Sequence, residues 1–460
     1  MRFTTIIWTA ILLTAAAPAL GDTIVVDHAG GGDYVNIQDG IDAASQGDTV
    51  LVLGGVYTGE RNRDLDFGGT ALRLEGSAGH LLTTIDCDGL GRGFRFHSGE
   101  DTSAVVYGVL VTNAAADSGA GTFCQNGSGP KFDQCIFADN HASVIGGGLC
   151  TVASSPVLRG CYLDSNTSSD GGLRNAYGGG AAFIDGSVLV MSGTQFVANQ
   201  TNGTGGGVYA RQSQISCASC EFHGNQVTTY GYHGAGVYLQ QCNNSDFADC
   251  MFVGNGGLEA GLGAGLNVNS SAVSVTGCSF LNNLAGSAGG ARVSYASSTC
   301  VFDGCSFAGN VGTWNAAGGI QVLFDANVLI TKCTFVDNGS THIWCQQASP
   351  DIIECILAFS RSGPPVNCDE GTETPLITHC ILFGNAGGDD LCGGNHYDNA
   401  VIDPAFCDVW GYDLTLCEDS PCLPGLSPWG MPIGALGQGC PPCGTTVEST
   451  TWGGIKAMYR

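Results

Sequence analysis

One pair of carboxylates in this chain lies beside two arginines, an arrangement that could support acid–base chemistry. The stretch TTIDCDGLGRGFRF contains Asp86 and Asp88, followed by Arg92 and Arg95. Paired carboxylates act as general acid and base in polysaccharide cleavage, usually with a positive side chain close by. We therefore treat this stretch as a candidate catalytic site.

A second pair of carboxylates, Asp389 and Asp390, lies in the stretch GGDDLC, with His396 and Asp398 nearby. Adjacent aspartates in a loop form a solvated turn more often than an active site. Cleavage on a repeated scaffold would need carboxylates on neighbouring repeats, and neither pair recurs in an adjoining one. The sequence therefore does not support catalysis, and we assign no catalytic residue.

The scaffold that would position such residues is a repeat, of which ten copies can be aligned. Successive copies begin 22 to 33 residues apart, and an apolar residue lies two positions after each start and, Cys217 included, three positions before it. Asparagine follows nine of the ten starts by five residues, where it suits a turn and can bond to its neighbours in adjacent copies. The copies begin at Cys135, Cys161, Thr194, Cys220, Cys250, Cys278, Cys305, Cys333, Cys355 and Cys380.

Each copy has the pattern of three short strands. Apolar residues alternate with polar ones, as in SAVSV and GCSFLN, and bends of Gly, Asn and Ser separate these pieces. Three strands per copy, each with one inward face, predict one turn of a right-handed parallel β-helix. Stacked turns bring equivalent residues together at about 4.8 Å, so we expect an interior with columns of aromatic, aliphatic and cysteine side chains.

The cysteines divide into two groups, 23 in all. Those that begin the repeats would stack inside the column with Cβ atoms too far apart for a disulfide, and we expect reduced, buried thiols. A ladder of metal ions is the sharper alternative, but no CxxC-plus-His cluster supports it. The expected disulfide partners lie in loop-like sequence near the end of the chain and are Cys392, Cys407, Cys417, Cys422, Cys440 and Cys443.

The first 21 residues have the layout of a secretory signal peptide, cleaved before Asp22. Arg2 precedes an apolar run that ends in small residues, and no other stretch is apolar enough to span a membrane. We expect a secreted or cell-surface protein that is not transmembrane once this segment is removed.

Charge limits the partners of the mature protein. The net charge of −26 argues against binding to nucleic acid or to an anionic membrane. It also disfavours a polyuronate unless Ca²⁺ bridges the two anions. Ca²⁺ is the one cofactor that the acidic composition permits, and no metal-ligand set is assigned.

A binding surface is the favoured functional hypothesis. After the glycine pair of each copy, outward positions are expected at Cys150, Ala182 and the residues that follow in later copies. Tyrosine beside Arg, Gln and Asn on a flat sheet suits stacking and hydrogen bonding to a neutral glycan, although an ordinary solvated sheet would look the same. The candidate ligand-binding residues are Tyr209, Arg211, Tyr238, Gln240, Asn267, Arg292 and Gln321.

Residues 130–390 resemble a known family. FVANQTNGTGGGVY at 196–209 and FADNHASVIGGGL at 137–149 are similar to the FxxN and GG[A/G][I/L/V] repeat of chlamydial polymorphic outer-membrane proteins and of secreted bacterial right-handed β-helix repeat proteins. The stretch VDHAGGGDYVNIQDGIDAASQGDTVLVLGGVYTG resembles the opening of pectin-lyase-like β-helices. That resemblance implies a short capping helix with Ile37, Ile41 and Ala44 on its buried face.

The resemblance also implies two classes of function. The first is a structural, adhesive or glycan-binding role without catalysis, with extracellular polysaccharide or cell-surface components as partners. The second is a polysaccharide lyase or hydrolase, although the NTD, GHG and RIK strings of polygalacturonases and the WxDH run of pectate lyases are absent. The expected segments are a signal peptide (1–21), an N-terminal cap with the first coils (22–125), repeated coils (126–390), a cysteine-rich C-terminal cap (391–443) and a tail that could serve sorting (444–460).

Overall fold

The computed structural model shows an all-parallel β-helix, as the repeat predicted. No helix of the described residues is long and apolar enough to cross a membrane. The expected tail, and all but the last residue of the expected signal peptide, lie outside these residues. The described residues are 21–169, 177–229, 233–257, 261–296, 299–314, 316–369, 371 and 373–443.

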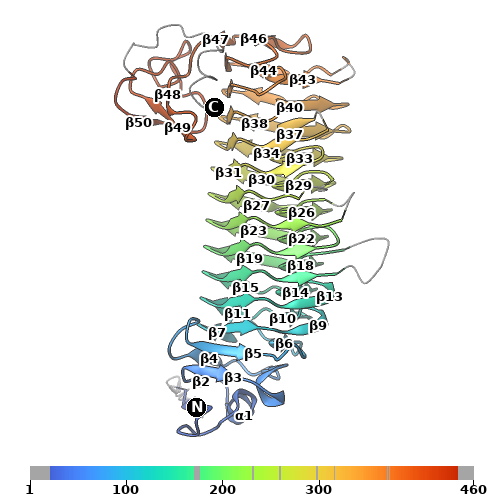
Figure 1. Ribbon diagram of the computed structural model, residues 1–460, viewed down its shortest axis with the longest axis vertical. Coiled ribbons are helices and arrows are strands. Elements are labelled where there is room, and N and C mark those ends of the chain that lie inside the picture. Colours follow the sequence, from blue (N-terminus) through green and yellow to red (C-terminus); the bar gives the residue numbers. More distant parts are fainter. Residues whose placement is uncertain are drawn as a thin grey trace, which may run out of the picture.

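Three long sheets form the sides of a column that rises from the N-terminal end to the C-terminal end (Figure 1). A 15-stranded sheet runs from β1 (Thr23–Val26) to β46 (His396–Tyr397), and a 14-stranded sheet from β3 (Gly55–Tyr57) to β47 (Ala400–Val401). The third has 11 strands, from β6 (Phe94–Phe96) to β43 (Val366–Cys368). All pairs within them are parallel, and each turn that contributes a strand to the third sheet also adds one strand to each of the other two.

The interior columns follow from the repeat register. Six phenylalanine rings stack face to face with centroids 4.5–4.9 Å apart, at Phe196, Phe222, Phe252, Phe280, Phe307 and Phe335. The cysteines that begin the repeats lie beside them as buried free thiols, which confirms that prediction. Burial of each ring contributes about 1.5–3 kcal/mol, so every turn brings its own share of the core.

A ladder of buried asparagine amides runs along one corner of the column. In each of its seven links one amide N–H donates to the Oδ1 of the next asparagine at 2.9–3.0 Å. The same nitrogen also donates to a backbone carbonyl of the preceding turn, as Asn255 does to Phe222. The predicted hydrogen bonding between asparagines of adjacent turns is thereby confirmed. The ladder contains Asn140, Asn166, Asn199, Asn225, Asn255, Asn283, Asn310 and Asn338.

A buried histidine connects this ladder to its C-terminal end. Asn338 donates to Nδ1 of His342 at 3.1 Å, and Nε2–H of His342 donates to Oδ1 of Asn385 at 3.0 Å. Asn385 in turn donates its amide hydrogen to Oδ1 of Asp389 at 2.7 Å. Burial lowers the pKa of His342 to about 4. The imidazole is therefore neutral, as its two hydrogen bonds require.

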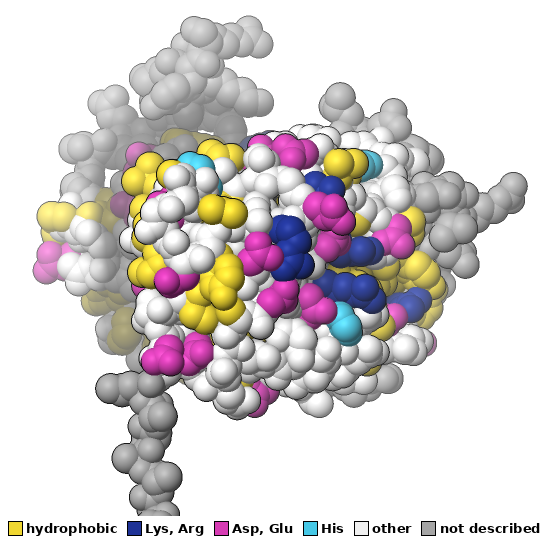
Figure 2. Space-filling model, turned by 90° about the horizontal axis from the view of Figure 1, so that it is seen from below, with side chains coloured by type: hydrophobic (Ala, Val, Ile, Leu, Met, Phe, Trp, Pro, Cys, Tyr) yellow, Lys and Arg dark blue, Asp and Glu magenta, His cyan; other side chains and the backbone are white. Residues whose placement is uncertain are grey.

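The one α-helix of the described residues, α1 (Ile37–Ala43), lies at the N-terminal end of the column (Figure 1). Ile37 and Ile41 are buried, and Ala44 just after the helix packs against the core. Seen from below, this end shows Lys and Arg side chains among Asp and Glu (Figure 2). Arg61, for example, pairs with both Asp39 and Asp42.

The last described residues fold back beside the upper coils (Figure 1). A small sheet of β48 (Phe406–Asp408), β49 (Asp413–Cys417) and β50 (Gln438–Cys440) belongs to this segment. Its apolar side chains share a core with outward residues of the 14-stranded sheet. This second core contains Ala308, Val336, Ile356, Ala358 and Ile381 of the column and Phe406, Leu414, Leu416, Cys422 and Ile433 of the segment.

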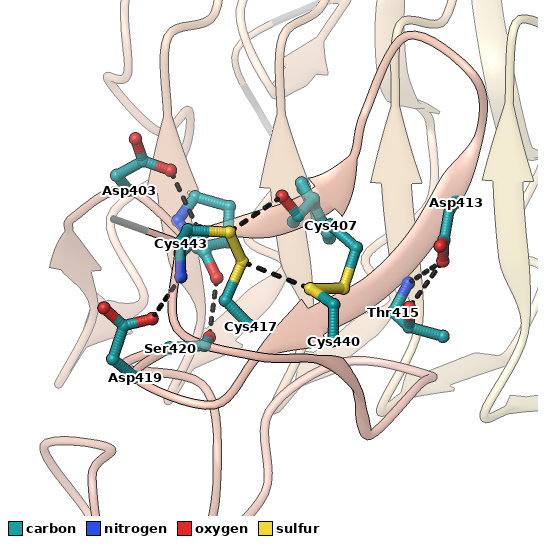
Figure 3. Close-up of a disulfide and its surroundings, with 12 residues drawn as sticks. Asp403, Cys407, Asp413, Thr415, Cys417, Asp419, Ser420, Cys440 and Cys443 are labelled. Atoms are coloured by element: carbon teal, nitrogen blue, oxygen red, sulfur yellow. Dashed lines mark hydrogen bonds between the residues drawn. A yellow bond between two sulfur atoms is a disulfide. The ribbon is translucent and has the colours of Figure 1, made fainter. Parts of the chain in front are cut away.

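Three disulfides tie the C-terminal part of the chain. Cys407 pairs with Cys440 and Cys417 with Cys443, side by side in the small sheet (Figure 3). The third joins Cys392 to Cys368, which the sequence reading did not include. The expectation of a disulfide at Cys422 is wrong, because this thiol is free and buried in the second core.

Candidate ligand-binding face

The predicted binding residues lie on the outer face of the 11-stranded sheet. One row follows the strands β14 (Leu149–Val152), β18 (Ala182–Asp185), β22 (Val208–Arg211), β26 (Val237–Gln240), β29 (Leu266–Asn269), β33 (Ala291–Ser294), β37 (Ala317–Leu323) and β40 (Thr341–Gln346). Its side chains, in register, are Cys150, Phe183, Tyr209, Tyr238, Asn267, Arg292, Gln321 and Trp344.

The expectation of Ala182 in this row is wrong by one residue. Ala182 is paired with Leu149 and Val208, which face the interior, and Phe183 takes the outward place. In this copy Ala181 stands where the preceding copy has its last corner glycine, Gly148, so that the count from the glycines is shifted.

Other side chains cover the N-terminal half of the row, so neither an open binding face nor an ordinary solvated sheet is found there. Tyr209 is 2% exposed and Tyr238 is 7% exposed, and their rings stack at 5.6 Å. Phe183 continues the stack at 5.4 Å from Tyr209. Burial raises the pKa of Tyr209 well above its usual range. These tyrosines are outside the coil, but their faces are not free to stack on a ligand. The side chains packed over this cluster include Ile145, Val152 and Tyr177.

Arg211 and Gln240 lie in a second outward row and are engaged within the protein. Arg211 binds both carboxylate oxygens of Asp185, with Nε–Oδ1 at 2.8 Å and Nη2–Oδ2 at 2.6 Å. Its guanidinium also lies 4.5 Å from the ring centroid of Tyr177. The hydrogen bonds to Asp185 raise the pKa of Arg211. Gln240 accepts a hydrogen bond from the hydroxyl of Tyr209 at 2.6 Å.

The C-terminal half of the row is polar. Asn267, Arg292 and Gln321 are adjacent in register and buried. Asn267 donates its amide hydrogen to the carbonyl of Leu262 at 3.0 Å, and Gln321 Oε1 accepts a hydrogen bond from Ser287. The sequence prediction therefore brought together three residues that do form one group.

Two aromatic residues beside this group were missed by the sequence reading. Tyr295 and Phe324 follow β33 and β37 directly, and their rings stack at 4.7 Å. Tyr295 is 55% exposed. Both have a left-handed backbone, with φ of 54°. The three preceding turns have Gln212, Gln241 and Ser270 at this position, and a bulky aromatic residue with positive φ is uncommon. That departure is the signal that could have identified them.

The first carboxylate pair borders a shallow hollow of about 320 Å³. Asp86 accepts hydrogen bonds from the backbone N–H of Asp88 at 3.0 Å and from the Asn113 amide at 3.1 Å. Arg92 pairs instead with Asp117. Arg95, exposed on β6, belongs to the 11-stranded sheet. The expected grouping of two carboxylates with two arginines is therefore not formed.

The second pair of carboxylates and its two neighbours have separate contacts and do not form one group. Asp389 accepts hydrogen bonds from the side chain and the backbone N–H of Asn385, at 2.7 and 3.1 Å, and so ends the asparagine ladder. His396 begins β46, and the carbonyl of Asp398 accepts a hydrogen bond from the N–H of His379. Asp390 is an exposed neighbour.

Metal-ligand geometry is met at one place in the described part of the chain. The sulfur atoms of Cys407, Cys417 and Cys440 lie within 4.8 Å of one another. All three are in disulfides, so they offer no thiolate for a metal. The described carboxylates form no comparable group, and only the acidic composition permits Ca²⁺ as a cofactor.

A family model described as right handed beta helix region matches residues 50–280 and 264–403, which is most of the chain. No curated protein sequence matches. Among solved structures, ORF18 of Geobacillus virus E2 is 12% identical with a TM-score of 0.34; the match covers 75% of this chain and 57% of the viral one. The chain therefore spans a little over half of that protein.

Two further solved structures are similar at the same level. The catalytic domain of a GH87 alpha-1,3-glucanase is 12% identical with a TM-score of 0.35, and the match covers 84% of this chain and 69% of that one. The A-module of mannuronan C-5 epimerase AlgE6 from Azotobacter vinelandii is 16% identical with a TM-score of 0.32, covering 84% and 98%. Similarity this low carries no argument about activity.

Proposed function

The chain belongs to the family described as right handed beta helix region, and we propose that it is an exported protein that uses the outer face of its 11-stranded sheet to bind a glycan without cleaving it. Export through residues 1–21 and a place outside the cell belong to this proposal. The three disulfides support it, because disulfides persist in oxidising compartments.

The stacked pair of Tyr295 and Phe324 is the observation that carries the proposal. An exposed aromatic ring offers a flat apolar face, and a pyranose ring offers a flat patch of C–H groups of matching size. Arg292 and Gln321, which are 7% and 5% exposed, lie in the outward row beside this pair, and we propose that they donate to hydroxyl groups. Asn267, next in the row, is fully buried and is not proposed to touch the ligand. Four of the predicted residues are engaged within the protein and are not proposed to touch the ligand. They are Tyr209, Tyr238, Arg211 and Gln240.

Binding is tested with the mature protein, residues 22–460, on a glycan array, followed by titration of the best ligand. We expect the double variant Tyr295→Ala and Phe324→Ala to bind about thirtyfold more weakly with an unchanged Tm, because two aromatic contacts of about 1 kcal/mol each contribute about 2 kcal/mol. Tyr397→Ala is the matched control, since Tyr397 is equally exposed on another sheet. Absence of binding to any glycan, or unchanged affinity in the double variant, would refute the proposal.

The alternative function, a polysaccharide lyase or hydrolase, is tested in the same samples. Incubation with a panel of polysaccharides is followed by measurement of reducing ends and of unsaturated products. We expect neither. Product formation that is lost in Asp86→Asn would contradict the absence of cleavage and would place the catalytic site at the first carboxylate pair.

A further inference from the structure

Arg292 is the only lysine or arginine that is buried among the residues the structure describes, with 7% of its surface exposed. It lies on β33 in the outward row, between Asn267 on one strand and Gln321 on the next. A charged group in such a place costs several kcal/mol unless an opposite charge or a full set of hydrogen bonds offsets the lost hydration.

Within the described ranges, no carboxylate lies within ion-pair distance of Arg292. One hydrogen bond, from Nη1 to Oγ of Ser294 at 3.1 Å, is formed, and Nε has no partner there. Arg211, on the same face, has both oxygens of Asp185. The difference between Arg292 and Arg211 is notable because the chain has 41 acidic residues and only 15 lysines and arginines. Acidic side chains are abundant, yet none of the described ones pairs with the one buried cation.

The neighbours of Arg292 add further donors. Gln321 uses its Oε1 for the hydrogen bond from Ser287, which leaves its amide nitrogen to donate. Trp344, next in the row, has an indole N–H without a hydrogen-bond partner in the described part of the chain. Three consecutive strands thus present a guanidinium, an amide and an indole N–H, and this set of donors is complementary to an oxyanion.

We propose that Arg292, with Gln321 and Trp344, is a subsite for a single anionic group, a carboxylate or a sulfate ester, carried by the bound glycan. The inference rests on the proposed function, since the glycan is the one that stacks on Tyr295 and Phe324. The guanidinium takes both oxygens of the group in its planar fork, and this contact supplies the negative charge that no described carboxylate provides.

The overall charge restricts the glycan further. A net charge of −26 repels a polymer that carries an acidic group on every residue. One isolated group meets one buried cation and avoids most of that repulsion. The expected ligand is therefore a largely neutral glycan with occasional acidic branches or sulfate esters, in place of a polyuronate.

A first experiment measures the subsite without a glycan chain. The Tm of the mature protein is recorded with sodium glucuronate, glucose 6-sulfate or glucose, at equal ionic strength. We expect the two anions to raise Tm in proportion to the logarithm of their concentration and glucose to have no effect. The larger shift identifies the preferred group. Arg292→Met should abolish the shift, and Arg159→Met, which removes an exposed arginine from another sheet, should retain it.

A second experiment compares neutral and singly acidic members of the glycan series that binds best on the array. We expect Arg292→Met to lose about tenfold or more in affinity for the acidic member and clearly less for the neutral member, which loses only a hydrogen bond to a hydroxyl group. Arg292→Lys keeps the charge but lacks the planar fork, so its affinity for the acidic member should lie between those of the wild type and Arg292→Met.

The results separate the two proposals. No anion-dependent shift in Tm, or an equal shift in Arg292→Met, would overturn the subsite. Glycan binding with no preference for the acidic member would also overturn it and leave the proposed function intact. An Arg292-dependent shift without any glycan binding would refute the proposed function alone.

Discussion

The buried histidine at the end of the asparagine ladder should make the stability of the protein depend on pH. His342 accepts a hydrogen bond from Asn338 and donates one to Asn385, and a protonated ring could not accept the first. Its pKa is about 4 in the folded protein and 6.5 in the unfolded chain. Between these values the unfolded chain binds a proton that the folded protein does not, so the free energy of unfolding falls as the pH is lowered.

The size of the effect follows from the two pKa values. At about 1.4 kcal/mol for each pKa unit, the gap between 6.5 and about 4 corresponds to about 3 kcal/mol. This stability is fully present above pH 6.5, is lost progressively between pH 6.5 and 4, and changes no further below pH 4.

The assay is urea unfolding of wild type and His342→Gln at pH 7.5, 5.5 and 4.0, with fluorescence and circular dichroism as probes. Glutamine keeps a donor and an acceptor but does not titrate. We expect the variant to be the less stable at pH 7.5 and to close about 3 kcal/mol of that gap by pH 4.0. His396→Gln, at an exposed histidine, is the control and should parallel the wild type. A constant gap between His342→Gln and wild type at all three pH values would refute the reasoning.

Three further predictions concern the scaffold. Asn255→Ala should lower the free energy of unfolding by about 3–5 kcal/mol in urea titrations, because it leaves buried partners on both neighbouring turns unsatisfied; a loss below 1 kcal/mol would show that the ladder bonds contribute little. Phe280→Ala should cost about 3–5 kcal/mol in the same assay, whereas truncation of the exposed Met251 should cost under 1 kcal/mol, and equal costs would contradict the stacked core. Cys407→Ser should make the segment after residue 403 cleavable by chymotrypsin while the column stays resistant. Unchanged resistance of the segment would show that the second core alone holds it in place.

The interior of the column could be predicted from the sequence because it repeats. Phe252, Cys278 and Asn283 take their places from spacing alone, since every turn imposes the same inward and outward alternation. The same reasoning placed Asn267, Arg292 and Gln321 correctly in one outward row.

The covering of the outer face could not be predicted in this way. Tyr209 and Tyr238 are buried by corner residues such as Ile145 and Tyr177, which do not repeat and so leave no periodic signal. The roles of Asp389 and His342 depend on contacts between turns that end the ladder, and these occur once in the chain. The repeat thus predicts what every turn shares, whereas the candidate site depends on what single turns add.

The asparagine ladder consists of equivalent units, and different residues end it. Every internal amide donates towards the C-terminal end and accepts from the N-terminal side, so all its units are interchangeable and point one way. Insertion or deletion of a whole turn would therefore leave every internal bond intact. Only the ends need special residues, and at one end the hydrogens of the aligned amides meet the carboxylate of Asp389. A gene encoding such a chain can gain or lose whole coils, and change the length of its binding face, without redesigning the interior.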